Sequence, residues 1–142
     1  MADFPHEYKV SAKGGPDGTL PVESEGLPTL ETSAPPAFGG PKGHWSPETM
    51  LTGAVANCLI LTFRALAARM EWSDLEVNCT GVLEKGAGGI KFTKFNIKAK
   101  LTISGDTDED KARQTLENAK KFCLVTASLN AETELDAEIV KG

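Results

Sequence analysis

The 142-residue chain has little positive charge and few aromatic residues. Fifteen Lys and Arg against twenty Asp and Glu leave a formal charge of −5, and aromatic residues make up 6% of the sequence. A nucleic-acid-binding surface needs clustered basic residues, often with aromatic side chains among them. Nucleic acid is therefore not an expected partner.

Cysteine and histidine are also scarce. No two of the three cysteines stand at Cys-x-x-Cys spacing, and His6 and His44 are far in sequence from each other and from every cysteine. Structural zinc sites use closely spaced Cys and His ligands, and disulfide scaffolds use an even set of cysteines in secreted chains. We therefore expect no metal, no cofactor and no disulfide framework, and we expect a cytoplasmic protein.

Signals for secretion and for membrane insertion are missing or interrupted. The segment "MADFPHEYKV" has no basic region followed by an apolar run. Leu51–Met70 has the length of a membrane span, but Asn57, Arg64 and Arg69 interrupt it. We interpret this segment as a buried helix of a soluble protein without a membrane partner.

The first 45 residues are rich in glycine and proline and predict short strands. Three short extended segments, His6–Ala12, Thr19–Glu25 and Thr29–Thr32, are expected to form a hairpin plus a third strand. The intervening "GGPDG" predicts a turn, because Pro16 presets its own φ and Gly18 accepts a positive φ.

A long helix is predicted after this region. Ser46 is suited to the N-cap, Pro47 to the first helical position and Glu48 to the first turn. Small and apolar residues then recur mostly at steps of three and four: Met50, Leu51, Ala54, Val55, Cys58, Leu59, Thr62, Ala65, Leu66 and Met70. We expect this helix to be buried on most sides and to end near Glu71.

The second half of the chain predicts two strands, a helix and a last strand. "LEVNCTGVLEK" and "IKFTKFNIKAKLTIS" alternate between apolar and polar residues, with a change of parity that suggests a bulge near Thr93 or Lys94. A helix capped by Asp106 or Thr107 runs to Cys123, "LVTASLN" suggests a short helical turn, and "ETELDAEIV" suggests a strand. The pattern indicates one α+β domain over residues 1–142.

Each cysteine has a structural interpretation as well as a chemical one. Cys79 shares its strand face with apolar residues, so we interpret it as a core residue. Cys58 taken alone is also explained by packing. Cys123 follows Lys120 and Lys121, cations that can lower the pKa of a thiol. At this point both Cys58 and Cys123 can still be explained as core residues without a chemical role.

Two motifs resemble signatures of the OsmC/Ohr family, the osmotically inducible and organic hydroperoxide resistance proteins. "SPETMLTGAVANCLILTFRALAARM" has the Ser-Pro-Glu start and a small-residue helix in which Cys58 stands ten positions after Glu48. "KFCLVTASL" resembles the second signature, in which Cys123 ends a later helix. The order of the predicted elements also fits an OsmC-like fold over nearly the whole chain.

The resemblance implies a thiol-dependent peroxidase. Cys58 would be the peroxidatic thiolate and Cys123 the resolving thiol, joined in an intrasubunit disulfide that an external dithiol, such as a lipoylated protein, reduces. The apolar helix around Cys58 suits an organic hydroperoxide. An alternative is an OsmC-fold binding module for a small apolar or thiol-bearing ligand without efficient peroxidase activity.

The resemblance also implies an intertwined homodimer. Ten helical residues span about 15 Å, so Glu48 cannot reach the thiol of its own copy, and a second copy would have to bring it. Family members place a glutamate and an arginine of their interface near the thiolate.

The chain departs from the family at two positions. Pro16 stands where the peroxidase branch often has an arginine in a "GGRDG" turn, and Leu124 replaces a proline that commonly follows the second cysteine. Lys13, Lys42 or Arg64 could substitute for the arginine. Without such a cation, we expect burial to raise the pKa of the Cys58 thiol.

Overall fold

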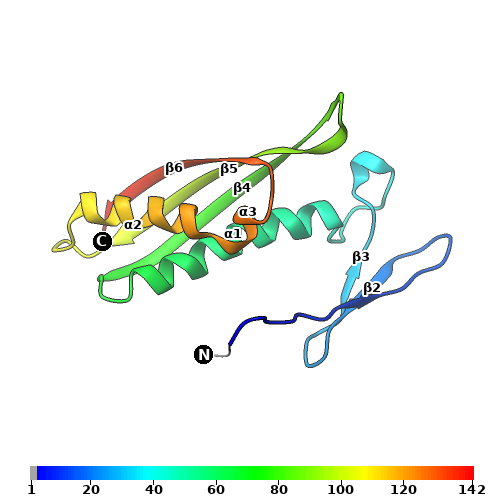
Figure 1. Cartoon of the computed structure of the whole chain (residues 1–142), viewed down its shortest axis with the longest axis horizontal. Coiled ribbons are helices and arrows are strands. Elements are labelled where there is room, and N and C mark those ends of the chain that lie inside the picture. Colours follow the sequence, from blue (N-terminus) through cyan, green and yellow to red (C-terminus); the bar gives the residue numbers. More distant parts are fainter. Residues whose placement is uncertain (1–2) are drawn as a thin grey trace. The chain divides into compact units, whose positions relative to one another are not determined.

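The computed structural model describes residues 3–142, which form two compact units that meet between Met50 and Leu51 (Figure 1). The first unit contains β1 (Ser11–Ala12), β2 (Leu20–Glu23), β3 (Leu30–Thr32) and the 3-10 helix η1 (Pro36–Phe38). Helix α1 (Pro47–Leu66) begins there and continues into the second unit, which also contains β4 (Trp72–Gly86), β5 (Gly89–Ile103), α2 (Glu109–Phe122), α3 (Leu124–Ala127) and β6 (Glu132–Lys141). This is the predicted α+β class, whereas a single folding domain stays a prediction.

The first unit holds the predicted antiparallel arrangement of three short strands, in the order β1-β2-β3. Gly18 adopts a φ of 92° in the turn before β2, as the sequence predicted. The first strand is much shorter than the predicted His6–Ala12, because only Ser11 and Ala12 pair with β2. The other two strands lie within their predicted ranges.

The second unit contains a three-stranded sheet in the order β4-β5-β6. Strands β4 and β5 form a long antiparallel hairpin, while β6 pairs with β5 in parallel. The parallel pairing follows from the connection, because α2 and α3 carry the chain back before β6 begins. The predicted bulge is confirmed: Val82 pairs with Lys94 and Leu83 with Phe92, which leaves Thr93 as the extra residue.

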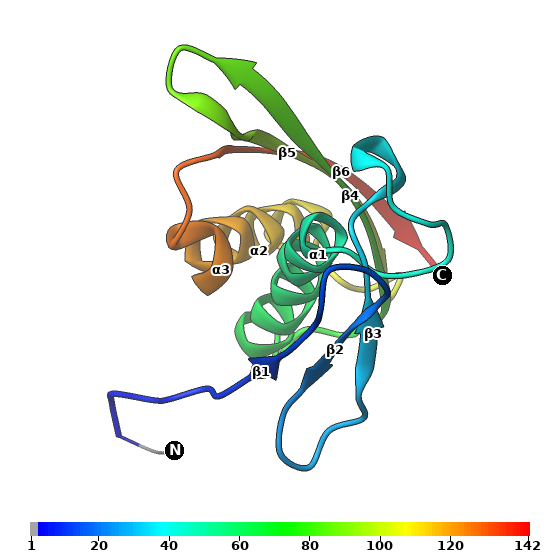
Figure 2. The same ribbon diagram turned by 90° about the vertical axis from the view of Figure 1, so that its right-hand side faces the viewer.

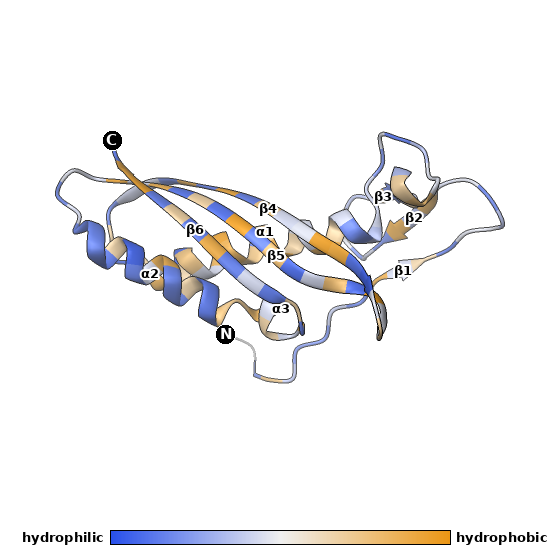
Figure 3. Cartoon of the chain, turned by 90° about the horizontal axis from the view of Figure 1, so that it is seen from above, coloured by the Kyte–Doolittle hydropathy of each residue, from blue (hydrophilic) through white to orange (hydrophobic). Residues whose placement is uncertain are grey.

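Helices α1 and α2 cover one face of this sheet (Figure 2). The core between the two layers consists of Val55, Leu59, Phe63 and Ala67 from the α1 segment, Ala112, Leu116 and Ala119 from α2, Leu75 from β4, and Phe95, Ile97, Ala99, Leu101 and Ile103 from β5. The spacing of four in α1 and of two in β5 is the periodicity expected for one buried face of each. Figure 3 shows that α2 carries broad polar stretches, whereas α1 is mainly neutral or apolar.

The N-terminus of α1 is capped as predicted. The Thr49 N–H donates to Ser46 Oγ at 3.1 Å, and the Ser46 N–H donates to Thr49 Oγ1 at 2.8 Å. This reciprocal pair satisfies two backbone donors, in the manner of a capping box. The helix ends at Leu66 rather than near Glu71, because the following residues form a tighter turn in which the Met70 N–H bonds to the Ala67 carbonyl at 3.0 Å.

The surface of α1 is more exposed than the sequence predicted. Only Val55, Leu59 and Phe63 are buried within the helix, and Leu61 and Leu66 are 52% and 46% exposed. The helix contributes one narrow row of buried side chains to the core. The sheet of this chain covers only the side of the helix that carries this row. By length and composition α1 could also cross a membrane, a property that core helices of globular proteins share.

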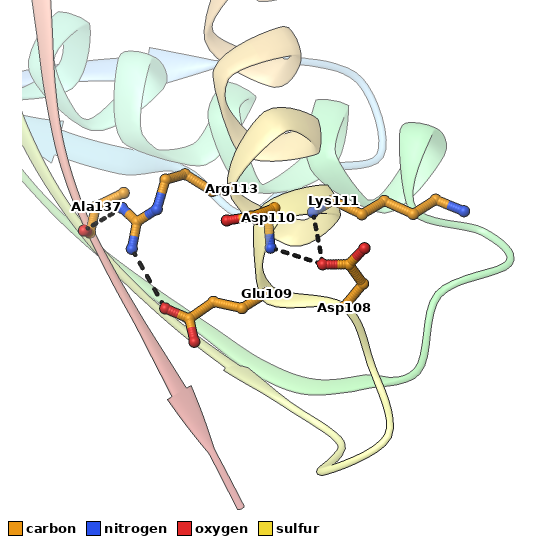
Figure 4. A network of polar contacts seen from close by, with 6 residues as sticks. All are labelled: Asp108, Glu109, Asp110, Lys111, Arg113 and Ala137. Atoms are coloured by element: carbon orange, nitrogen blue, oxygen red, sulfur yellow. Dashed lines mark hydrogen bonds and ion pairs between the residues drawn. The ribbon is translucent and has the colours of Figure 1, made fainter.

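The N-cap of α2 is Asp108, not Asp106 or Thr107 as predicted. Its carboxylate accepts the N–H groups of Asp110 and Lys111 (Figure 4). Thr107 is held outside the helix, because its hydroxyl donates to the Glu71 carbonyl at 2.9 Å. The cap therefore lies one residue after Thr107 and two after Asp106.

Arg113 ties α2 to the last strand of the sheet (Figure 4). Its guanidinium donates to the Ala137 carbonyl of β6 at 3.0 Å and lies 3.8 Å from the Glu109 carboxylate one turn earlier. This contact orients α2, and with it the helix end that carries Cys123, along the sheet.

Gly81 marks a close approach of β4 to its neighbours in the second unit. A Cβ at this position would lie 2.7 Å from Thr52 Oγ1 and 2.9 and 3.0 Å from Cε1 of Phe92 and Phe95. Real side chains essentially never make contacts this short to packed neighbours, so the absent side chain permits α1 and the sheet to pack.

We expect Gly81→Ala to lower the free energy of unfolding by about 1–3 kcal/mol, because the added methyl overpacks the core. The measurement is urea unfolding at fixed protein concentration. Gly86→Ala is the matched control, since a Cβ there meets nothing within 4 Å, and its effect should stay within about 0.5 kcal/mol. Equal effects of the two substitutions would contradict the inferred close packing.

Candidate thiol site

Cys58 lies in the middle of α1, within the second unit, and is partly buried. Thr62 follows it by one helical turn, so the two side chains share a face. The distance between Cys58 Sγ and Thr62 Oγ1 is 3.8 Å, which is a hydrogen-bonding contact for the large sulfur atom.

Cys123 lies at the junction of α2 and α3. It ends α2 as its C-cap and begins α3 as its N-cap, with an extended backbone (φ −63°, ψ 117°) that breaks the helix. The Ala127 N–H and the Thr126 hydroxyl both bond to its carbonyl, at 3.0 and 3.3 Å. The side chain is 2% exposed, so this junction is fixed and its thiol is buried.

The fold brings these two cysteines together. The Cys58 and Cys123 thiols lie close enough for each to shift the pKa of the other, and both are free thiols. The backbone N–H groups of Leu124 and Val125, at the start of α3, also lower the pKa of the Cys58 thiol. The Cys58 sulfur therefore has one thiol and several polar donors around it.

The expectation of a raised pKa for Cys58 is wrong. Burial raises the pKa of the Cys58 thiol, but hydrogen bonds from the Val125 N–H, the Cys123 thiol, the Thr62 hydroxyl and the Leu124 N–H outweigh it, so that the pKa lies below its ordinary value. That expectation rested only on the missing cation. Neutral donors supply the stabilisation of the thiolate instead.

Cys123 has the opposite balance. Burial raises the pKa of the Cys123 thiol, hydrogen bonds from Thr126 lower it in part, and the neighbouring Cys58 raises it further. The predicted influence of Lys120 and Lys121 is not among these causes, and the Lys121 ammonium lies 5.9 Å from the centre of the Phe122 ring. When one of the pair ionises, Cys58 is the thiolate and Cys123 keeps its proton.

Cys79 is a separate thiol in β4. It packs against the hydrophobic core of the second unit and pairs with Ile97 of β5. Burial raises the pKa of Cys79 to about 11, with no compensating donor. Its interpretation as a structural residue is confirmed.

The remaining site candidates lie elsewhere in the chain. Glu48 is in the first turn of α1, and Pro16, Lys13 and Lys42 belong to the first unit. Arg64 is exposed on α1, two residues after Thr62. An approach of any of these side chains to the thiolate stays a prediction. Within residues 3–142, no cluster of three or more His, Cys, Asp or Glu could hold a metal ion.

The donors around Cys58 were not predicted from the sequence. The spacing of four between Cys58 and Thr62 was a usable signal, because such pairs meet on a helix. The contributions of Leu124 and Val125 had no local signal, since they depend on α3 packing against α1.

Two neighbouring thiols, one partly exposed with a lowered pKa and one buried, lie on helices that cover a mixed three-stranded sheet. This arrangement defines an α+β protein with a site of two paired cysteines. The chain belongs to the OsmC-like protein family, whose model matches residues 39–138. The match includes both cysteines and the whole of α1.

Individual proteins match over nearly the full length. YmaD of Bacillus subtilis, an uncharacterized protein, is 27% identical over 149 residues, which is 100% of this chain and 99% of that protein. An OsmC-like protein of unknown function from Vibrio cholerae has a TM-score of 0.85 at 19% identity, with 96% of this chain and 100% of that chain covered. An organic hydroperoxide resistance protein OsmC from Legionella pneumophila has a TM-score of 0.75 at 18% identity, with 97% and 99% covered. At these identities the two structures show the shared fold.

Proposed function

We propose that this protein is a thiol-dependent peroxidase that reduces organic hydroperoxides. The observation that carries the proposal is the contact between the Cys58 thiol, whose pKa is lowered, and the buried Cys123 thiol. A lowered pKa increases the fraction of reactive thiolate at a given pH. The neighbouring Cys123 thiol supplies the partner for a disulfide.

The first step uses Cys58. Its thiolate attacks the outer oxygen of the hydroperoxide ROOH, the O–O bond breaks, and the departing alkoxide takes up a proton to give ROH. Cys58 becomes a sulfenic acid, so the sulfur is oxidised by two electrons and the peroxide is reduced by two.

The second step uses Cys123. Its sulfur attacks the sulfenic acid of Cys58, the S–O bond breaks, and water leaves with the Cys123 proton. The product is a disulfide within one subunit. An external dithiol, such as a lipoylated protein, reduces this disulfide by thiol exchange and restores both thiols.

The protein is further proposed to act as a cytoplasmic homodimer. The half-exposed Leu61 and Leu66 on α1 support a second copy as cover for this helix. In such a dimer Glu48 of one subunit would approach Cys58 of the other, which its ten-residue separation prevents within a single helix.

The test is the thiol titre before and after one equivalent of cumene hydroperoxide. We expect two of the three thiols to be lost, and peptide mapping should find Cys58 joined to Cys123 while Cys79 stays free. The reason is the contact between the first two thiols and the separate, core-packed position of Cys79.

Two results would contradict the proposal. A bridge that contains Cys79 would mean that the observed contact is not the reactive one. An unchanged titre would favour a binding module for a small apolar or thiol-bearing ligand. Hydrogen peroxide serves as the comparison substrate, because an apolar helix around the thiol should favour the organic peroxide.

A further inference from the structure

Thr62 has an unusual hydrogen-bonding partner for a threonine inside a helix. Such a hydroxyl commonly donates to the carbonyl of the residue four positions earlier. Thr115 of α2 does so, because its hydroxyl donates to the Lys111 carbonyl at 2.8 Å.

The Thr62 hydroxyl contacts a side chain instead. Its oxygen lies 3.8 Å from the sulfur of Cys58, one turn earlier. A helical side chain leans toward the N-terminus of its helix, so a residue at position 62 reaches over the one at position 58. The threonine methyl fixes χ1 more tightly than a serine would allow, which restricts where the hydroxyl points.

We propose that Thr62 is a positioning residue for Cys58, whose hydroxyl donates a hydrogen bond to the thiolate and holds it toward the Cys123 thiol. A hydroxyl can serve as donor to the thiolate and as acceptor toward the thiol, so it accommodates both protonation states. A hydrogen bond to the charged form favours that form, and this donor contributes to the lowered pKa.

Neutral groups stabilise the Cys58 thiolate. The titratable group that faces it is the Cys123 thiol from the junction of α2 and α3, and the same junction supplies the N–H groups of Leu124 and Val125. Among the described residues, no Lys, Arg, Asp or Glu contributes to the pKa of Cys58. Thr62 is the one contributor from α1 itself.

An effect of Thr62 on peroxide reduction rests on the proposed function, but its effect on the pKa of Cys58 does not. The experiment therefore measures alkylation of Cys58 by iodoacetamide as a function of pH, quantified by peptide mass, in a Cys79→Ser background that keeps Cys123. The variants are Thr62→Val, which removes the hydroxyl at nearly constant shape, and Thr62→Ser, which keeps it. Thr115→Val is the control, because it removes a helical hydroxyl that bonds only to backbone.

We expect Thr62→Val to raise the apparent pKa of Cys58 by about 0.5–1 unit, which slows alkylation below that pKa by about two- to threefold, because the more basic thiolate is also the better nucleophile. Thr62→Ser keeps the hydroxyl, so the pKa of Cys58 should stay close to the parent value. Thr115→Val should leave the pH profile of Cys58 unchanged. Circular dichroism checks folding, and Thr62→Ala provides a second variant without the hydroxyl.

Two outcomes would overturn the proposal: a profile of Thr62→Val that coincides with the parent, or a shift that Thr62→Ser does not reverse, since packing would then be the cause. If the shift appears and no variant consumes cumene hydroperoxide, the positioning role stands and the proposed peroxidase function fails. The two hypotheses are therefore separable in one set of proteins.

Discussion

Cys58→Ser should abolish the reduction of cumene hydroperoxide, with a loss of at least about 10³-fold in turnover, as is typical when the nucleophile of a covalent mechanism is removed. The serine hydroxyl is of similar size, but it stays protonated in the physiological range and cannot form a sulfenic acid. The measurement is hydroperoxide consumption with dihydrolipoamide as the dithiol.

The other two cysteines supply the controls. Cys79→Ser should keep the rate within about twofold, because Cys79 packs against the core and lies outside the thiol pair. In the absence of the external dithiol, Cys123→Ser should consume one equivalent of peroxide and leave Cys58 as a sulfenic acid that a dimedone probe detects. Normal turnover by Cys58→Ser would rule out Cys58 as the peroxidatic residue.

A second large effect is expected in the reactivity of the individual thiols. Burial raises the pKa of Cys79 to about 11, whereas the pKa of Cys58 lies below its ordinary value. The thiolate fractions at neutral pH should therefore differ by at least about 10²-fold. The more basic thiolate is the better nucleophile, by roughly tenfold over two units. Cys58 should thus be alkylated at least about tenfold faster than Cys79 at pH 7.

The alkylation rates of Cys58 and Cys79 should also depend differently on pH. Alkylation of Cys58 should reach its plateau at a lower pH than an ordinary thiol, because its charged form is stabilised. The rate for Cys79 should continue to rise toward pH 11. Alkylation followed by peptide mass analysis over a pH series gives both curves, and a faster reaction of Cys79 at pH 7 would contradict the assignment of the donors.

Leu124→Pro is the most specific variant for these curves. Leu124 is the first residue of α3, a position where proline is well tolerated because its φ suits the helix start. Proline removes the N–H that the Cys58 thiolate uses. The Cys58 profile should shift to higher pH, while the Cys79 profile should not move.

These donors give the two departures from the family pattern a common interpretation. The chain has Pro16 where an arginine is frequent and Leu124 where a proline is frequent. Leu124 supplies an N–H that a proline could not, and this N–H stabilises the same thiolate that an arginine would. We infer that part of the role of a charged partner is carried by neutral groups in this protein.

The sequence by itself determined the elements and where most of them begin. Ser46, Pro47 and the small-residue pattern placed α1, because capping and helical periodicity are local properties. The parity change placed the bulge near Thr93 or Lys94, since side chains alternate strictly along a strand, and the register shows Thr93 as the extra residue. The two cysteine motifs indicated the family, and its model matches residues 39–138.

Errors in the prediction arose where several local choices were nearly equal. Asp106, Thr107 and Asp108 are all good caps, and a contact from Thr107 to the distant Glu71 carbonyl decided among them. The exposure of α1 was also misjudged, because periodicity reports which residues are apolar and not how many neighbours the chain provides to cover them.

Only the tertiary structure decided the chemistry of the thiols. Cys58 and Cys123 are far apart in sequence, and the fold brings the second thiol and the N–H groups of Leu124 and Val125 close to the first. The pKa of a thiol depends on the balance between desolvation and hydrogen bonds in its immediate surroundings. The sequence contains the residue that ionises, but the donors that stabilise its charge come from a distant segment, so the direction of the shift follows from the fold.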